Sequence, residues 1–394
     1  MFPGAGADRS TAAYVVLGAP LDVTTTFRPG TRFGPARIRQ FAATFDDYDH
    51  RTDSRFIDLG VHDQGDIHAW TDVEEYLSYL TGVVTDIVDD DAVPLLLGGE
   101  HTISVAGVRA VEPDVFVCLD AHLDLRTEYD GDRWSHATTT RHALEVATTA
   151  VVIGARTGAE DEWERAAQDD VIVVTPEDVE EWITAVAAGD GPFDPADRLY
   201  LSVDIDVLDP AFAPGTGTME PFGVDPTCCR TIVETLAPMT VGFDVVEVND
   251  ADDGQAATIA GKLLRTFIYH HAASESKRLA GRATEPGHSS PDESLSSPEP
   301  AAVEPAADRS DGTTADELRI DVDRETVRRV VRLLQNRAFP VERSSFVSIA
   351  TSAYELDGIE VDAVLDLAID RGMIEQRGPM LHRLSTDDDT DTSD

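Results

Sequence analysis

Carboxylate and imidazole side chains follow three apolar runs in the sequence. Asp120-Ala121-His122-Leu123-Asp124 comes directly after a run that ends at Leu119, Ser202-Val203-Asp204-Ile205-Asp206 continues another, and Gly98-Gly99-Glu100-His101 follows Leu97. Alternate residues of an extended chain point to one side, so these groups should converge where parallel strands end. Carboxylates that lie close together repel one another unless cations lie among them. The spacing therefore predicts a metal centre.

Imidazole and carboxylate ligands together suit divalent ions of the manganese type, and six of them suffice for two ions if two carboxylates bridge. Taken singly, each motif has an ordinary structural explanation. An Asp-x-Asp pair can cap a turn or helix, and His101 can be a buried histidine with satisfied hydrogen bonds. The combination favours metal binding, and the predicted ligands are His101, Asp120, His122, Asp124, Asp204 and Asp206.

The segments around these motifs predict an α/β fold with a mainly parallel sheet. Short apolar runs alternate with longer stretches of helical period, and the runs are nearly continuous in hydrophobicity, as strands covered on both faces should be. A helix should open at Gly34-Pro35, because proline is well tolerated at the first helical position. The predicted strands are 14–17, 93–97, 115–119, 151–153, 171–174, 199–203 and 241–246.

The charge balance excludes several kinds of partner. Among 394 residues, 75 are acidic and 31 are Lys or Arg, which gives a net charge of −44. Such a surface repels phosphate and anionic lipid, which argues against nucleic-acid binding by the whole chain and against a polybasic membrane anchor. At molar salt the screening length falls to about 3 Å, so we interpret the composition as halophilic.

The sequence also predicts a cytoplasmic protein. No apolar segment approaches the roughly 18 residues that a membrane helix needs. Its three cysteines, Cys118, Cys228 and Cys229, cannot form a disulfide framework, because two are adjacent and the third lies in an apolar run. A reducing compartment is therefore expected.

Composition divides the chain into four parts. Residues 1–271 form the predicted catalytic domain, and 272–315 form an acidic linker rich in Ser, Pro and Ala that cannot bury enough apolar surface to fold. Residues 316–384 should form a small helical domain, since Val361, Val364, Leu365 and Ala368 follow helical spacing. A hairpin should end that domain, with Gly378-Pro379 at its turn. Residues 385–394 are an acidic tail.

The small domain weakly resembles a winged helix. Its Arg324, Arg328 and Arg332 are spaced along one helical face, where they would meet phosphate or an acidic surface. Two interpretations stay open: 316–384 binds nucleic acid, or its arginines contact protein, including the acidic catalytic domain. The excess of acidic residues favours protein contact.

Residues 14–271 resemble the ureohydrolases, the family of arginase, agmatinase and formimidoylglutamase. The resemblance rests on the three motifs above and on their continuation through Asp209-Pro210 to Pro214-Gly215-Thr216-Gly217-Thr218. It implies a three-layer arginase-like fold, two Mn²⁺ ions and a homo-oligomer, trimeric or hexameric. It also implies ligand sets for each ion, with Asp120 and Asp204 as bridges: His101, Asp120, Asp124 and Asp204 for one, and Asp120, His122, Asp204 and Asp206 for the other.

The resemblance also implies three catalytic residues. His136 in Ser135-His136-Ala137-Thr138 corresponds to a proton-shuttling histidine, although the family usually has Gly at position 137. Glu247 corresponds to a carboxylate that pairs with the guanidinium group, and Asp124 would carry a proton to the leaving amine. The alternatives are an exposed loop histidine and a helix-capping glutamate. A member that only binds its ligand is disfavoured, because every ligand position holds a competent residue.

The resemblance leaves two substrate classes open. Arg28-Pro29-Gly30-Thr31-Arg32-Phe33-Gly34-Pro35 is similar to agmatinase, and implies hydrolysis of agmatine, a small cationic guanidino compound, to putrescine and urea. Leu125-Arg126 after Asp124 is closer to formimidoylglutamase, and Arg126 near the site would favour a carboxylated formimino or guanidino substrate. Alternatively, Arg126 points outward or pairs with Glu128, Asp130 or Asp132. We expect this second arrangement, and hence agmatine.

Overall fold

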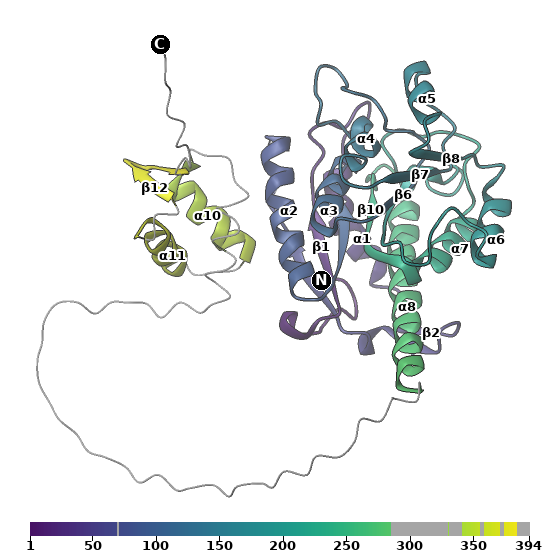
Figure 1. Ribbon diagram of the computed structural model, residues 1–394, viewed down its shortest axis with the longest axis horizontal. Helices are drawn as coiled ribbons and strands as arrows, with labels where there is room; N and C mark the ends of the chain where they lie inside the picture. Colours follow the sequence, from purple (N-terminus) through teal and green to yellow (C-terminus); the bar gives the residue numbers. More distant parts are fainter. Residues whose placement is uncertain (69–70, 285–329, 331–340, 355–357, 371–373, 384–394) are drawn as a thin grey trace, which may run out of the picture.

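The computed structural model describes residues 1–68, 71–284, 330, 341–354, 358–370 and 374–383. Its central feature is an eight-stranded sheet in the order β4-β1-β5-β10-β9-β6-β7-β8 (Figure 1). Every neighbouring pair in this sheet is parallel. The strands are β1 (Tyr14–Ala19), β4 (Val61–Asp66), β5 (Val93–Gly98), β6 (Val115–Leu119), β7 (Thr149–Ile153), β8 (Val171–Val174), β9 (Leu199–Asp204) and β10 (Thr240–Val246). The predicted α/β class and all seven predicted strands are confirmed.

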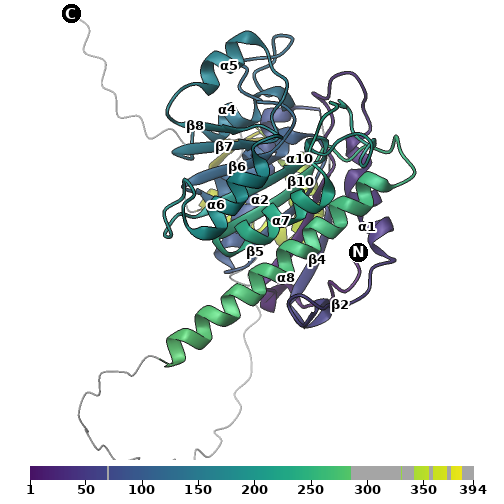
Figure 2. The same cartoon turned by 90° about the vertical axis from the view of Figure 1, so that its right-hand side faces the viewer.

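Helices cover both faces of the sheet, which gives the predicted three layers (Figures 1 and 2). On one face lie α1 (Gly34–Ala42), α6 (Val179–Ala188), α7 (Pro226–Leu236) and α8 (Gln255–Thr284), which contact one another in series. On the other lie α2 (Val73–Asp89), α3 (Ser104–Val111) and α4 (Thr139–Ala143), and the short α5 (Glu160–Ala166) contacts β8. As predicted, α1 begins at Gly34-Pro35.

The two helical layers explain why the seven predicted strands are nearly continuous in hydrophobicity. Val16 and Leu95 pack into the core under α1, α7 and α8, whereas Val15 and Leu96 pack into the core under α2 and α3. All four are fully buried. Successive side chains of a strand point to opposite faces, so a sheet covered on both sides needs an unbroken apolar run.

The sequence did not predict β4, which forms the edge of the sheet beside β1. Its sequence is polar, yet Asp63 is buried there because the Arg39 guanidinium donates to its carboxylate, with Nη2 2.8 Å from Oδ1. An edge strand has only one neighbour and can carry such a pair. A small antiparallel hairpin, β2 (Tyr48–Asp49) and β3 (Ser54–Arg55), was also not predicted.

Among the described residues, seven short 3₁₀ helices connect the larger elements, and three of them, η4, η5 and η6, begin at or next to predicted site residues. They are η1 (Arg9–Thr11), η2 (Thr31–Phe33), η3 (Phe56–Asp58), η4 (His101–Ile103), η5 (His136–Thr138), η6 (Ile205–Val207) and η7 (Ala237–Met239). The chain therefore turns sharply where it leaves β5 and β9.

Helix α8 crosses the predicted boundary at 271 and continues to Thr284 (Figure 2). The beginning of the predicted linker is thus helical. Its first residues, Ala272-Ala273-Ser274-Glu275-Ser276-Lys277-Arg278, contain several good helix formers and no proline, which the average composition of 272–315 concealed. Residues 285–315 lie outside the described part of the chain.

Near the C-terminus the structure describes two helices and a small sheet. They are α10 (Arg343–Tyr354), α11 (Gly358–Asp370), β11 (Val341–Glu342), β12 (Ile374–Arg377) and β13 (Met380–Arg383). The predicted hairpin is present as β12 and β13, and Gly378 adopts a φ of 63° in its turn. Val361, Val364, Leu365 and Ala368 form the buried face of α11. Arg324, Arg328, Arg332 and residues 385–394 lie outside the described residues.

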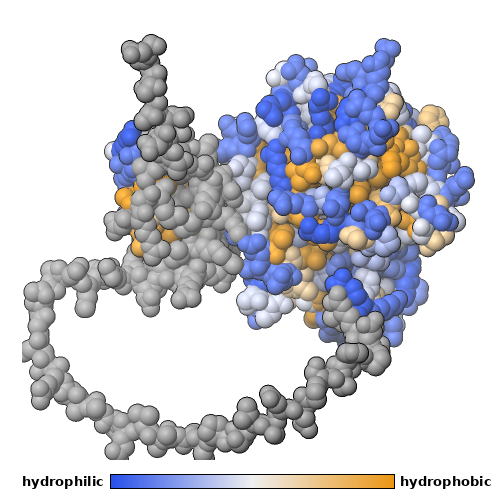
Figure 3. All heavy atoms as spheres, in the orientation of Figure 1, coloured by the Kyte–Doolittle hydropathy of each residue, from blue (hydrophilic) through white to orange (hydrophobic). Residues whose placement is uncertain are grey.

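The surface agrees with the acidic composition. Hydrophilic side chains cover much of the face seen in Figure 3, with smaller hydrophobic areas between them. Among the described helices, none has both the length and the apolar character needed to cross a membrane.

Candidate active site

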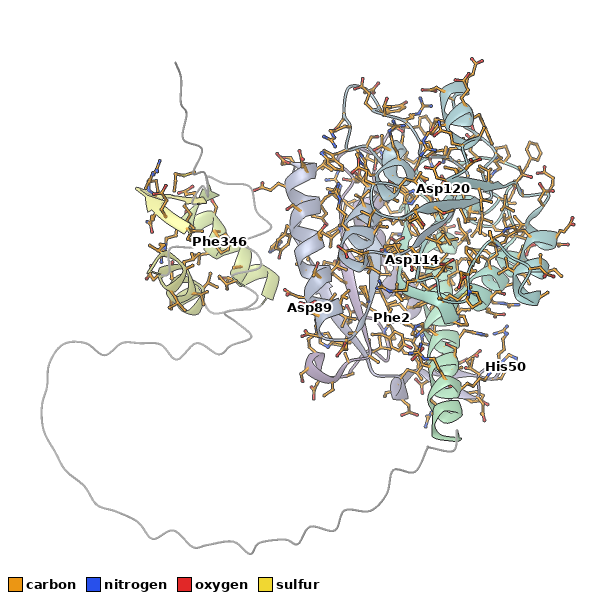
Figure 4. The ribbon with its side chains drawn as sticks, viewed as in Figure 1. Phe2, His50, Asp89, Asp114, Asp120 and Phe346 are labelled. Atoms are coloured by element: carbon orange, nitrogen blue, oxygen red, sulfur yellow. The ribbon has the colours of Figure 1, made fainter. Side chains whose placement is uncertain are left out.

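The predicted site residues lie at the carboxyl ends of the four central strands. These strands, β5, β10, β9 and β6, are neighbours in the sheet. His101 follows β5, Glu247 follows β10, Asp204 ends β9, and Asp120 follows β6. Figure 4 labels Asp120 at this edge of the sheet. Ligand sites of parallel sheets commonly form at such strand ends, where the strand order reverses.

His101 lies at the centre of one group of carboxylates. Its Nδ1 is 2.8 Å from Asp124 Oδ2, 3.0 Å from Asp120 Oδ2 and 3.7 Å from Asp204 Oδ2. The ring is fully buried, and Nδ1 makes no hydrogen bond of good geometry with any of them. A buried nitrogen without a hydrogen bond, surrounded by carboxylate oxygens, fits a bound divalent cation.

His122 forms a second group with carboxylates. Its Nδ1 is 3.0 Å from Asp206 Oδ2 and 3.4 Å from Asp120 Oδ1. The ligand atoms of Asp120, His122 and Asp206 lie close enough together to hold one ion. Asp120 thus directs one oxygen to each group, so the structure brings together all six predicted ligands in two adjoining clusters.

Burial perturbs the ionisation of these carboxylates. Burial and the neighbouring Asp206 raise the pKa of Asp204 well above its usual range, and burial with the Asp120 charge raises the pKa of Asp124. Burial acts in the same direction on Asp120, but the neighbouring His101 and His122 side chains hold its pKa below the usual range. Cations in the clusters would favour the charged form of every carboxylate.

Cys118 also lies beside the first group, which the sequence analysis did not anticipate. Its Sγ is 3.6 Å from His101 Nε2 and 3.7 Å from Asp120 Oδ2. Its sulfur and the ligand atoms of His101 and Asp120 lie close enough together to hold one ion. Burial raises the pKa of this thiol well above its usual range, which disfavours the thiolate form that binds a metal. The imidazole nitrogens and carboxylate oxygens of the two clusters fit a manganese-type ion.

A buried chain of hydrogen bonds orients the His101 ring. His101 Nε2 is 3.1 Å from Ser202 Oγ, and the Ser202 hydroxyl donates to Asp244 Oδ1 at 2.6 Å. The Tyr200 hydroxyl donates to the other oxygen of Asp244 at 2.8 Å. Partners of this kind fix the ring of a metal-binding histidine, here with Nδ1 toward the carboxylates. The sequence signal was Asp244 itself, the only charged residue in the apolar run 241–246.

We predict that Asp244→Asn weakens metal binding. The amide keeps the shape of the side chain but removes the negative charge that strengthens the hydrogen bond from the Ser202 hydroxyl. The His101 ring, which contacts Ser202, is then less well oriented. The expected result is a metal affinity lower by about 10- to 100-fold, with kcat largely restored at saturating Mn²⁺. Isothermal titration of the metal-free protein with Mn²⁺ measures the metal affinity.

Tyr200→Phe is the matched control, because it removes the hydrogen bond to the other oxygen of the same carboxylate. Its metal affinity should change less than threefold, a rough bound for a contact that does not lead to His101. Equal losses in the two variants would contradict a role for Asp244 through Ser202.

His136 and Glu247 face each other beside the metal-binding clusters. His136 Nδ1 is 3.6 Å from Glu247 Oε1, and its Nε2 is 3.1 Å from Thr26 Oγ1. The His136 side chain is 13% exposed, which does not match an exposed loop histidine. Glu247 Oε1 also accepts the His101 backbone N–H at 2.9 Å, so Glu247 does cap η4 while it faces His136. Its φ of 59° is a strained value for glutamate, of the kind found at functional sites.

Glu100 holds the loop that contacts His136. Its buried carboxylate accepts hydrogen bonds from Thr24 N and Thr24 Oγ1, both at 2.8 Å, and from Thr102 Oγ1 at 3.0 Å. Thr24 Oγ1 in turn accepts the His136 backbone N–H at 3.0 Å. The sequence placed Glu100 in a motif without assigning it a role, and the structure connects it to His136.

A cavity of about 330 Å³ opens over these groups. That volume suits a small linear substrate. Its lining combines residues of both clusters with residues of four connecting segments and of α5: Thr26, His122, Asp124, Arg126, Tyr129, His136, Ala137, Thr157, Gly158, Ala159, Glu162, Asp204, Asp206 and Thr218.

Arg126 lines this cavity, but its ion-pair partner differs from those predicted. Its Nη2 lies 3.1 Å from Glu162 Oε2 on α5, rather than beside Glu128, Asp130 or Asp132. The prediction that an acidic residue of its own loop pairs with Arg126 is wrong. Glu162 belongs to a different element, so spacing along the chain could not identify it.

Comparison with known proteins agrees with this geometry. Residues 12–269 match the family model described as "Arginase family", and residues 326–381 match one described as "Winged helix C-terminal domain". An agmatinase of Pyrococcus horikoshii is 33% identical over 267 residues, which cover 65% of this chain and 91% of that protein.

Two further relatives carry related names. An N(1)-aminopropylagmatine ureohydrolase of Thermococcus kodakarensis is 33% identical over 64% of this chain and 88% of its own length. The solved structure of agmatine ureohydrolase of Thermoplasma volcanium is 33% identical, with a TM-score of 0.65, over 70% of this chain and 95% of that one. The chain therefore belongs to the arginase family, as a ureohydrolase with a winged helix domain in its C-terminal part.

Proposed function

We propose that this protein hydrolyses agmatine to putrescine and urea with two Mn²⁺ ions. The observation that carries the proposal is the ion pair between Arg126 and Glu162. Among the described residues that line the cavity, Arg126 is the only Lys or Arg. Because no unpaired cation stands in the described lining to receive a substrate carboxylate, a substrate with a cationic tail is favoured over a guanidino acid. The agmatinase relatives support the same substrate.

The proposed ions would be held by the two clusters. His101, Asp120, Asp124 and Asp204 would bind one, and Asp120, His122, Asp204 and Asp206 the other, with Asp120 and Asp204 shared. Two divalent cations lower the pKa of water to about 7, and so supply at neutral pH the strong nucleophile that a resonance-stabilised guanidinium carbon requires. The distances around His101 and His122 support this assignment.

The chain's own residues would orient the substrate and move protons. Glu247 would accept hydrogen bonds from the guanidinium N–H groups, which fixes the plane of the group. As the water oxygen adds to the guanidinium carbon, Asp124 would take a water proton and deliver it to the nitrogen of the bond that breaks. The products are urea and a protonated amine, which balances the reaction.

His136 would relay a proton between this site and the solvent. It reaches both Glu247 and the cavity, and its side chain keeps a small solvent-exposed area. Burial opposes protonation, but the nearby Glu247 carboxylate outweighs it and raises the pKa of His136. A histidine whose protonated form is stabilised by a carboxylate can hold and release a proton, which suits this role.

The setting of the proposed enzyme follows from composition and family resemblance. We infer a cytoplasmic homo-oligomer, trimeric or hexameric, that is stable at molar salt, where its net charge of −44 is screened. Nucleic-acid binding by the C-terminal domain stays a less favoured alternative to protein contact.

A substrate panel tests the proposal. Urea release is measured at molar salt with Mn²⁺ for agmatine, N(1)-aminopropylagmatine, arginine and 4-guanidinobutanoate, and formamide release for N-formimidoylglutamate. Agmatine or its aminopropyl derivative should exceed the carboxylated compounds in kcat/KM by at least about tenfold. Turnover of the carboxylated compounds alone would overturn the proposal and favour a guanidino-acid hydrolase or formimidoylglutamase. Preference for the aminopropyl derivative would show that the substrate amine carries an extension.

A further inference from the structure

In the pair of Arg126 and Glu162, the acid is buried and the arginine is partly exposed. The Glu162 side chain is 4% exposed and the Arg126 side chain is 33% exposed, and both residues line the cavity. The buried acid therefore lies behind the arginine, which separates it in part from the solvent. A pair of this kind is screened by salt less than an exposed pair.

Glu162 is fixed by the backbone as well as by Arg126. Its Oε1 accepts the Leu125 N–H at 3.2 Å, and its Oε2 accepts the Ala159 N–H at 2.9 Å. The second bond satisfies the backbone N–H of Ala159, the residue that precedes α5. The first ties Glu162 to the segment between Asp124 and Arg126. The acid is thus held in place before any substrate arrives.

Arg126 is also held on its other side. Its guanidinium lies 5.4 Å from the centre of the Tyr129 ring, which lines the same cavity. A cation over an aromatic face is stabilised there. Between Tyr129 and Glu162, the arginine has little freedom to turn toward a ligand.

We propose that Glu162 determines which substrates this site accepts, by neutralising Arg126 so that the cavity wall offers no free cation to a substrate carboxylate. The inference rests on the proposed hydrolysis of agmatine and adds a residue that no motif of the site contains. With the pair intact, Arg126 and Glu162 together add no net charge to the wall, which tolerates the amine of agmatine. Without Glu162, Arg126 adds one positive charge, which repels that amine and attracts a carboxylate.

Glu162→Gln and Arg126→Gln test the proposal in opposite directions. Both variants are assayed as the full chain with Mn²⁺ at molar salt, by the ratio of kcat/KM for 4-guanidinobutanoate to that for agmatine. In Glu162→Gln the ratio should rise about tenfold or more, mainly through KM, since the charge acts on binding rather than on the bond that breaks. In Arg126→Gln the exposed acid should favour agmatine, and the ratio should fall.

Two controls separate charge from structure. Asp170→Asn breaks a comparable pair, Arg165 with Asp170, whose two hydrogen bonds are both 2.7 Å and which lies away from the cavity. Its ratio should equal that of the wild type. The double variant Glu162→Gln with Arg126→Gln restores a wall without charge, and its ratio should return to within about threefold of the wild type, which a merely structural effect of Glu162 would not produce.

The outcomes distinguish this inference from the proposed function. An unchanged ratio in Glu162→Gln, or a ratio that moves the same way in both single variants, overturns the role of Glu162 while agmatine remains the wild-type substrate. A wild-type enzyme that prefers 4-guanidinobutanoate overturns the proposed function itself. If Glu162→Gln loses its fold because one backbone N–H has lost its acceptor, Arg126→Gln decides alone: a fall in its ratio supports the proposal, and a rise or no change refutes it.

Discussion

Asp204→Asn should lower kcat for urea release by on the order of a thousandfold or more, and the purified protein should no longer hold two ions. Asp204 ends β9, and its Oδ2 lies 3.7 Å from His101 Nδ1 within the first cluster. An amide is a weaker ligand than a carboxylate, and it removes one of the four negative charges that would balance two divalent cations. The measurements are urea formation from agmatine at saturating Mn²⁺ and the metal content per chain.

The same reasoning applies to Asp120→Asn, since Asp120 directs one oxygen toward each histidine. Asp209→Asn is the matched control. Asp209 follows the same strand but accepts the Phe222 N–H at 2.7 Å, and Asp209 itself does not line the cavity. It should keep both ions and most of its activity. Two ions and near-normal turnover in Asp204→Asn would refute the proposed metal centre.

His136→Asn should lower kcat about 100-fold or more without changing the metal content. Removal of a group that transfers protons typically costs two to four orders of magnitude, and asparagine cannot carry a proton. His136 contacts Glu247 and Thr26 rather than the two metal-binding clusters, so the ions should stay. Urea release and metal content are measured on the same preparation. Added imidazole should restore part of the activity, because a free base can enter the space that the ring leaves.

His62→Asn is the control for this substitution. Its Nδ1 hydrogen-bonds to Ala7 O at 2.8 Å, and it lies in the edge strand β4. Its kcat should match the wild type. If His136→Asn loses its ions together with its activity, or keeps more than about a third of its turnover, the proton-relay role is wrong.

The sequence alone predicted the elements that depend on local signals. Leu95-Leu96-Leu97 and Val115-Phe116-Val117 were predicted as strands covered on both faces, because short apolar runs without alternation are typical of a parallel sheet. Asp120, His122 and Asp124 had to share one side of the chain that leaves the strand. The chemistry of the donors is likewise a property of residue types, so the sequence alone predicts an ion of the manganese type, and this stays a prediction.

Tertiary structure decided which of these groups meet. β10 inserts between β5 and β9, and this order, which joins strands far apart in the chain, places Glu247 beside His101 and Asp244 behind Ser202. Glu162, the partner of Arg126, comes from α5 for the same reason. The polar edge strand β4 formed because a buried ion pair with Arg39 compensates for its sequence. Residue type and spacing determine what a side chain can do, but strand order and helix packing determine its partners, because those contacts join residues that no local pattern relates.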